Sequence, residues 1–187
     1  MSTVETRAAV VVPGRQFGPY QPLLFYAAEA ARSRGATVRF LDWRPPASID
    51  PPAESGQRQA WVLDEVGTVL DRLGATSLVV GKSLGSYAAE LAARRHLPAV
   101  WYTPLLYDDL VVASLRAATA PFLLIGGTAD VPAWNGALAR SLTPHVCEIE
   151  GADHGLTVPG PVAGWAPVLG EVTAAMERFL DDVVWRS

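Results

Sequence analysis

Short apolar runs alternate with amphipathic segments along the chain, and this alternation constrains the fold more than any other feature of the sequence. Parallel strands that are buried on both faces read as continuous apolar runs, and the helices that cross between them carry one apolar stripe. The pattern predicts an α/β fold, a three-layer sandwich around a mostly parallel sheet of about six strands. The expected strands are residues 8–12, 37–41, 77–80, 99–102, 122–125 and 146–150.

The segments between these runs carry helix signals. One helix should open near Pro22 and close at Gly35, because proline tolerates the first helical position and glycine the C-terminal end. Further helices are expected over residues 62–73, 84–96 and 107–118, from Pro132 onward, and over residues 172–183. The sequence has no internal repeat and no linker-like stretch, so we expect residues 1–187 to form a single α/β domain.

Composition excludes several classes of protein. The net charge is −4 and the sequence pI is about 5.3, with lysine and arginine dispersed, which argues against a nucleic-acid partner. The first apolar run, residues 8–12, is too short for a signal peptide or a membrane span, so we expect a cytoplasmic protein with no membrane partner. The single cysteine, Cys147, excludes an internal disulfide.

The pentapeptide Gly81-Lys82-Ser83-Leu84-Gly85 fits the G-x-S-x-G pattern and lies where an expected strand meets an expected helix. A serine in such a turn adopts a strained backbone conformation, and glycines two residues to either side let the strand and the helix approach closely. The turn exposes the Ser83 hydroxyl. It also points a helix N-terminus at the place where a tetrahedral oxyanion would form.

A serine hydroxyl needs a neighbouring base, and three histidines are available. His96 lies at the expected C-terminal end of the helix that follows Ser83. His145 begins a strand, so it lies on the side of the sheet opposite to the carboxyl ends of the strands. Only His154 lies in a loop just beyond the carboxyl end of a strand, where ligands meet an open α/β sheet. His154 is therefore the predicted general base.

The base needs a carboxylate to orient it, and three candidates remain open on the residues alone. Asp130 follows the strand at residues 122–125 and lies in a loop at the right edge of the sheet, although it could also cap a helix before Pro132. Asp42 also lies just past a strand. Asp153 is adjacent to His154, which hinders it from reaching back to the same ring.

With Ser83, Asp130 and His154 in the order nucleophile, acid, base, the sequence resembles a compact, lidless member of the α/β-hydrolase family, similar to its dienelactone-hydrolase-like branch. The resemblance runs from Ala8 to about Val183. It implies an oxyanion hole made by the backbone N–H of Leu84 and by a second donor in the first crossover loop. In Pro13-Gly14-Arg15-Gln16 that donor would be Arg15. The usual His-Gly of this loop is replaced by Pro13-Gly14, and this departure leaves Gln16 as the alternative donor. The resemblance also implies that catalysis requires no metal or cofactor.

Several residues are candidates for a substrate pocket because they lie in or near loops at the carboxyl ends of strands. These residues are Gln16, Trp43, Tyr102, Trp134 and Trp165; the aromatic ones could equally cover the core. Lys82 could direct an anionic substrate group or bond protein oxygens. We expect a serine hydrolase that cleaves a small ester, thioester or lactone, with a small-molecule acyl compound as its partner. The alternatives are a non-hydrolytic ligand-binding protein and an acyl-transfer protein on the same scaffold.

Overall fold

A computed structural model describes residues 7–50, 53–73 and 78–186, and its centre is a six-stranded sheet in which every strand pairing is parallel. The strand order is β2-β1-β3-β4-β5-β6. Six parallel strands confirm the predicted sheet, although Ser77, the expected first residue of the third strand, lies outside the described residues. The strands are β1 (Ala8–Val12), β2 (Thr37–Phe40), β3 (Leu78–Lys82), β4 (Ala99–Tyr102), β5 (Phe122–Gly127) and β6 (Val146–Ile149).

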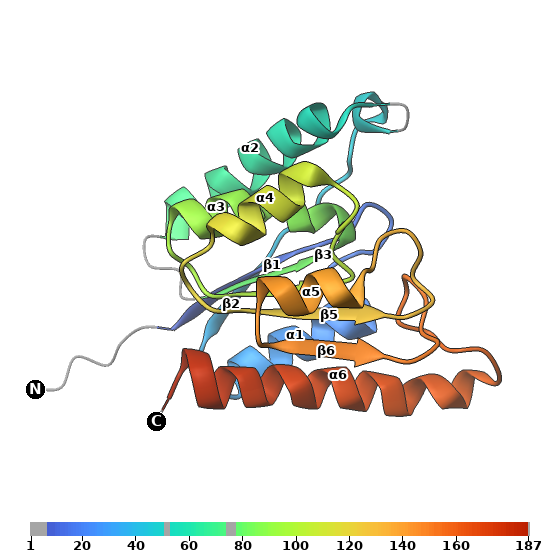
Figure 1. Cartoon of the computed structure of the whole chain (residues 1–187). Coiled ribbons are helices and arrows are strands. Elements are labelled where there is room, and N and C mark those ends of the chain that lie inside the picture. The colour runs from blue at the N-terminus through green and yellow to red at the C-terminus, as the bar shows by residue number, and fades with distance from the viewer. Residues whose placement is uncertain (1–6, 51–52, 74–77, 187) are drawn as a thin grey trace, which may run out of the picture.

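Helices cover both faces of the sheet and complete the predicted three layers (Figure 1). Alternate residues of one strand enter different cores: Val10 packs toward one layer of helices and Val11 toward the other. Both side chains are fully buried, as the apolar runs of the sequence require. On one face lie α1 (Pro22–Arg32) and α6 (Trp165–Phe179), and on the other α2 (Ser55–Leu73), α3 (Ala89–Arg94), α4 (Asp109–Ala117) and α5 (Gly136–Leu142).

The helix expected from Pro132 begins four residues later, so that prediction is wrong. The Asn135 side chain caps α5 by accepting a hydrogen bond from the Leu138 N–H, and Asp130 does not cap this helix. The preceding turn instead inserts Trp134 against β5, where a side chain on Gly126 would lie 2.0 Å from the indole. This tight packing explains why the chain turns inward before the helix begins.

The segment after Ser83 is also less regular than expected. Instead of one helix over residues 84–96, a 3₁₀ helix runs over Ser83–Ala88 and the α-helix α3 follows it. A tighter first turn keeps the chain close to the end of β3. The helix expected over residues 107–118 is confirmed as α4, with the Asp108 side chain as its N-cap.

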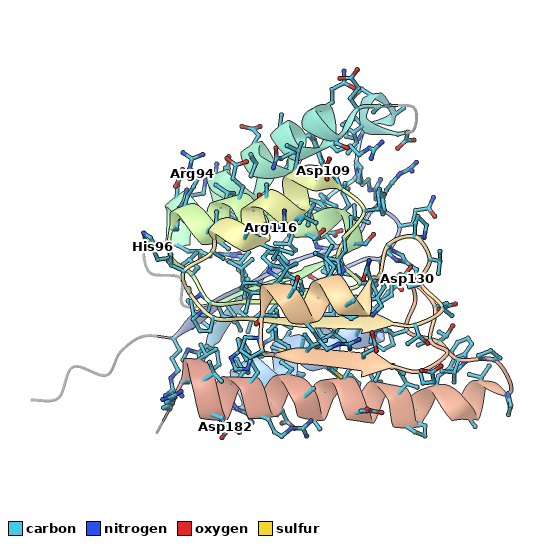
Figure 2. All side chains as sticks on the ribbon, viewed as in Figure 1. Arg94, His96, Asp109, Arg116, Asp130 and Asp182 are labelled. Atoms are coloured by element: carbon cyan, nitrogen blue, oxygen red, sulfur yellow. The ribbon has the colours of Figure 1, made fainter. Side chains whose placement is uncertain are left out.

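The carboxyl ends of the strands meet at one edge of the sheet (Figure 1). Asp130 lies at that edge, whereas His96 lies at the opposite end of the molecule (Figure 2). His96 bonds Thr119 there, with 2.7 Å between Nδ1 and Oγ1. Among the described residues, no helix is both long and apolar enough to cross a membrane.

Candidate active site

Ser83 directly follows β3 and has a left-handed backbone conformation, with a φ of 50°. Non-glycine residues rarely adopt this region, and where they do the surrounding structure must hold them there. The G-x-S-x-G pattern predicts this strained backbone conformation of the serine. It turns the serine hydroxyl away from the sheet and toward the loops that follow the neighbouring strands.

The two glycines of the pattern make this turn possible. A Cβ on Gly81 would lie 2.5 Å from the Trp101 ring of the neighbouring strand, and a Cβ on Gly85 would lie 2.8 Å from the Pro13 carbonyl oxygen. Real Cβ atoms do not approach other atoms this closely. Glycine is therefore required at both positions by the packing of β3 and its 3₁₀ helix against β4 and the end of β1.

A continuous chain of hydrogen bonds joins Ser83, His154 and Asp130. The Ser83 hydroxyl lies 2.8 Å from His154 Nε2, and His154 Nδ1 lies 2.9 Å and 2.8 Å from the two oxygens of the Asp130 carboxylate. Asp130 is buried, whereas the His154 side chain is 44% exposed. The structure thus brings together the three residues that the sequence singled out, and the carboxylate on the ring belongs to Asp130 rather than to Asp42.

Asp153, the other candidate acid, has a different task. Its carboxylate accepts hydrogen bonds from the backbone N–H groups of Gly155 and Thr157 and from the Thr157 hydroxyl. Burial alone would raise the pKa of Asp153, but these hydrogen bonds outweigh it and hold the pKa below its usual value. Asp153 therefore shapes the loop that carries His154 and does not orient the imidazole.

Lys82 is buried immediately before Ser83, with 1% of its surface exposed. Its ammonium donates to the Thr103 hydroxyl and to the His154 backbone carbonyl, each at 2.8 Å, and lies 4.8 Å from the centre of the Phe17 ring. Burial lowers its pKa to about 8, although Asp130 and Asp153 act in the opposite direction. Protein oxygens thus use two of the three donors of the ammonium. Lys82 ties the His154 loop to β3 and β4.

A cavity of about 300 Å³ opens beside Ser83. Arg15 and Gln16, the two candidates for the second oxyanion donor, both line it. The Arg15 side chain points away to an ion pair with Asp50 at 2.6 Å, and neither the Arg15 nor the Gln16 backbone N–H donates to any described residue. Beside the cavity, the loop thus has two backbone N–H groups with no partner among the described residues. The remaining residues that line the cavity are Gly14, Phe17, Lys82, Ser83, His154 and Gly155.

The aromatic pocket candidates occupy different places. Trp43 supports the loop of residues 13–16 from outside the cavity, because its indole N–H donates to the Gly14 carbonyl at 3.0 Å. Tyr102 and Trp134 are buried and bond Met176 and Glu148 respectively, so the structure places both in the core rather than on the cavity wall. Trp165 lines a second cavity next to the first.

Within the described part of the chain, no group of three histidine, cysteine or carboxylate side chains is placed to hold a metal ion. The groups gathered at Ser83 are a hydroxyl, an imidazole, a carboxylate and the backbone of residues 15 and 16, a set that can carry out acyl transfer.

The fold of the chain matches known structures along nearly its whole length. Est1E from Butyrivibrio proteoclasticus superposes with a TM-score of 0.71 at 13% identity, covering 94% of this chain and 87% of that one. The chain has the α/β-hydrolase fold. Dienelactone hydrolase from Anabaena variabilis superposes with a TM-score of 0.66 at 18% identity, covering 97% and 88% of the two chains.

A lidless α/β serine hydrolase from Xanthomonas campestris also shares this α/β-hydrolase fold, with a TM-score of 0.57 at 18% identity over 96% of this chain and 85% of that one. By sequence, no protein-family model and no curated protein matches the chain. The similarity therefore lies in the fold, at identities of 18% and below for these three structures.

Sequence reasoning left the role of Lys82 open and missed Thr103. A signal for Lys82 is present in the sequence, because it is the only lysine of the chain and stands next to the serine. Thr103 has a φ of 41°, which is rare for a β-branched residue and places its hydroxyl on the Lys82 ammonium. No pattern of neighbouring residues predicts that conformation.

Proposed function

We propose that the protein is a serine hydrolase that cleaves small carboxylic esters, thioesters or lactones through an acyl-enzyme on Ser83. The observation that supports this proposal is the unbroken hydrogen-bond chain from Ser83 through His154 to the buried Asp130, beside an open cavity. A serine hydroxyl, an imidazole base and an orienting carboxylate in this order form the apparatus of nucleophilic acyl transfer.

In the proposed acylation step, Ser83 Oγ forms a bond to the acyl carbon while His154 Nε2 takes the hydroxyl proton. The carbonyl electron pair moves onto its oxygen, where the N–H groups of Leu84 and Arg15 stabilise the negative charge. Asp130 holds the imidazolium in place. When the intermediate collapses, the bond to the leaving group breaks and His154 gives its proton to the departing oxygen or sulfur.

Water then resolves the acyl-enzyme by the same route. His154 takes a proton from the water as its oxygen attacks the acyl carbon, and it returns a proton to Ser83 Oγ when the carboxylic acid leaves. The 44% exposure of the His154 side chain gives water access to Nε2. The cycle ends with the enzyme unchanged and the ester hydrolysed.

The proposal is tested by reaction with a small alkyl fluorophosphonate, followed by peptide mass spectrometry. We expect one phosphonyl adduct on Ser83, its absence in Ser83→Ala, and its retention in the control Ser141→Ala, which changes an exposed serine on α5. If folded protein forms no adduct on Ser83, the proposal is wrong, and the alternative of a non-hydrolytic binding protein takes its place.

A further inference from the structure

A second cavity, of about 260 Å³, lies next to the one that contains Ser83. It is enclosed by the beginning of α1, the beginning of α6 and the loop that follows His154, on the face of the sheet where both helices pack (Figure 1). Phe17 and Gly155 line both cavities, so the second space adjoins the one that contains Ser83 at these two residues.

The walls of this second cavity are mostly apolar, and Gln21 and Thr157 are its polar lining residues. Leu23 and Leu156 are among the apolar ones, together with Leu169 and the ring of Trp165. The polar atoms nearby are largely committed elsewhere: the Trp165 indole N–H donates to the Val158 carbonyl, and the Thr157 hydroxyl donates to Asp153. A cavity with such walls favours a hydrocarbon group over a polar or charged one.

The volume also limits what can bind. A dry apolar cavity of about 150 Å³ is large enough to bind benzene. The 260 Å³ available here therefore accommodate a phenyl ring or a branched alkyl group of similar size. Because the cavity is separate from the loop at Arg15 and Gln16, filling it does not obstruct the groups that would bind the acyl oxygen.

We propose that this cavity, enclosed by Phe17, Gly155, Leu156 and Trp165, binds the apolar alcohol portion of the ester substrate. The proposal rests on the proposed function of Ser83. His154 Nε2 must protonate the leaving oxygen, so the leaving group has to lie on the His154 side of the reacting carbon. The cavity begins at Gly155, the residue that follows His154, and it continues along Leu156 and Thr157. The alcohol portion is thus the part of the substrate nearest to the cavity.

Two isomeric esters test the assignment. Benzyl acetate carries its phenyl ring on the alcohol side and methyl phenylacetate carries it on the acyl side, while their composition and size are the same. Since burial of a phenyl ring contributes to transition-state binding only where a cavity receives it, we expect kcat/KM to be about tenfold higher for benzyl acetate. Equal values, or a preference for methyl phenylacetate, would overturn the assignment.

A matched pair of substitutions locates the effect. Ala166 lines the second cavity in the first turn of α6, whereas Ala163 is exposed in the preceding turn and does not line it. Ala166→Trp should reduce the ratio of kcat/KM for benzyl acetate to that for methyl acetate by about tenfold, and Ala163→Trp should leave this ratio unchanged. An unchanged ratio in Ala166→Trp would refute the proposed site.

The fluorophosphonate adduct on Ser83 separates the two proposals, because its small alkyl groups need only the first cavity. Adduct formation without a preference for benzyl acetate would refute the alcohol site and leave the hydrolase intact. Absence of the adduct in folded protein would refute the hydrolase, and the alcohol site with it.

Discussion

Replacing Lys82 with methionine should change the stability of the protein by an amount that depends on pH. Lys82 is the only lysine of the chain, and its side chain is almost completely buried. Burial lowers its pKa from 10.5 to about 8, while the neighbouring Asp130 and Asp153 carboxylates partly oppose the shift. The charged form therefore carries a desolvation cost in the folded protein that is absent in the unfolded chain.

The sign follows from proton binding. Below pH 8 Lys82 is protonated in both states, and the folded state bears the full cost of the buried charge. Between pH 8 and about 10.5 the unfolded chain binds more protons, so the free energy of unfolding rises with pH. A shift from 10.5 to about 8 corresponds to about 3 kcal/mol, and methionine, which holds no proton, lacks this dependence.

Urea denaturation of the wild type and Lys82→Met at pH 7 and at pH 10.5, followed by circular dichroism, measures the difference. We expect the unfolding free energy of the variant, relative to that of the wild type, to be about 3 kcal/mol lower at pH 10.5 than at pH 7. All other titrating groups are shared and cancel. A relative stability that does not change with pH would refute the reasoning.

The pKa itself can be measured directly because the chain has one lysine. Protein labelled with ¹³C-lysine should show one side-chain Cε resonance that titrates with a midpoint of about 8. A midpoint near 10.5 would show that the ammonium is solvated in the folded protein and would contradict the packing of Lys82 between Thr103 and the His154 carbonyl.

Three further substitutions have defined outcomes. Asp130→Asn should lower kcat for a simple ester by about 10⁴-fold, because the imidazole loses its orienting carboxylate, whereas Asp42→Asn should leave steady-state rates unchanged. Gly85→Ala should lower the unfolding free energy in urea by about 1–3 kcal/mol because its Cβ would lie 2.8 Å from a backbone oxygen, while Gly56→Ala on α2, with open space around it, should not destabilise the protein. Trp43→Phe removes the hydrogen bond to the loop of residues 13–16 and should cost about 1 kcal/mol in the same assay; an unchanged midpoint would show that this bond does not stabilise the fold.

Local patterns in the sequence were sufficient to predict the architecture. Continuous apolar runs such as residues 8–12 and 99–102 are buried strands in the structure, and the helix expected over residues 62–73 is part of α2, which buries Val62, Val66 and Leu70. The G-x-S-x-G pattern likewise predicted the strained turn at Ser83. These features depend on residues that are near one another in the chain, so periodicity and turn chemistry reveal them.

Element boundaries were predicted less well where tertiary packing overrides local signals. Pro132 is a good first residue for a helix, yet the helix begins at Gly136 because Trp134 packs onto Gly126 first. The place of the Tyr102 side chain was also predicted wrongly. Its position at the end of β4 suggested a pocket residue, but strand alternation points its ring into the core beside Met176.

The sequence by itself determined the α/β architecture, the elbow at Ser83 and a short set of candidate side chains around it. Only the tertiary structure decided that Asp130 rather than Asp42 or Asp153 meets His154, that the Lys82 ammonium bonds Thr103 and the His154 carbonyl, and that Trp165 borders an apolar cavity. The physical reason is distance along the chain. Ser83 lies 71 residues from His154, and such contacts depend on strand order and loop packing, which local periodicity does not encode.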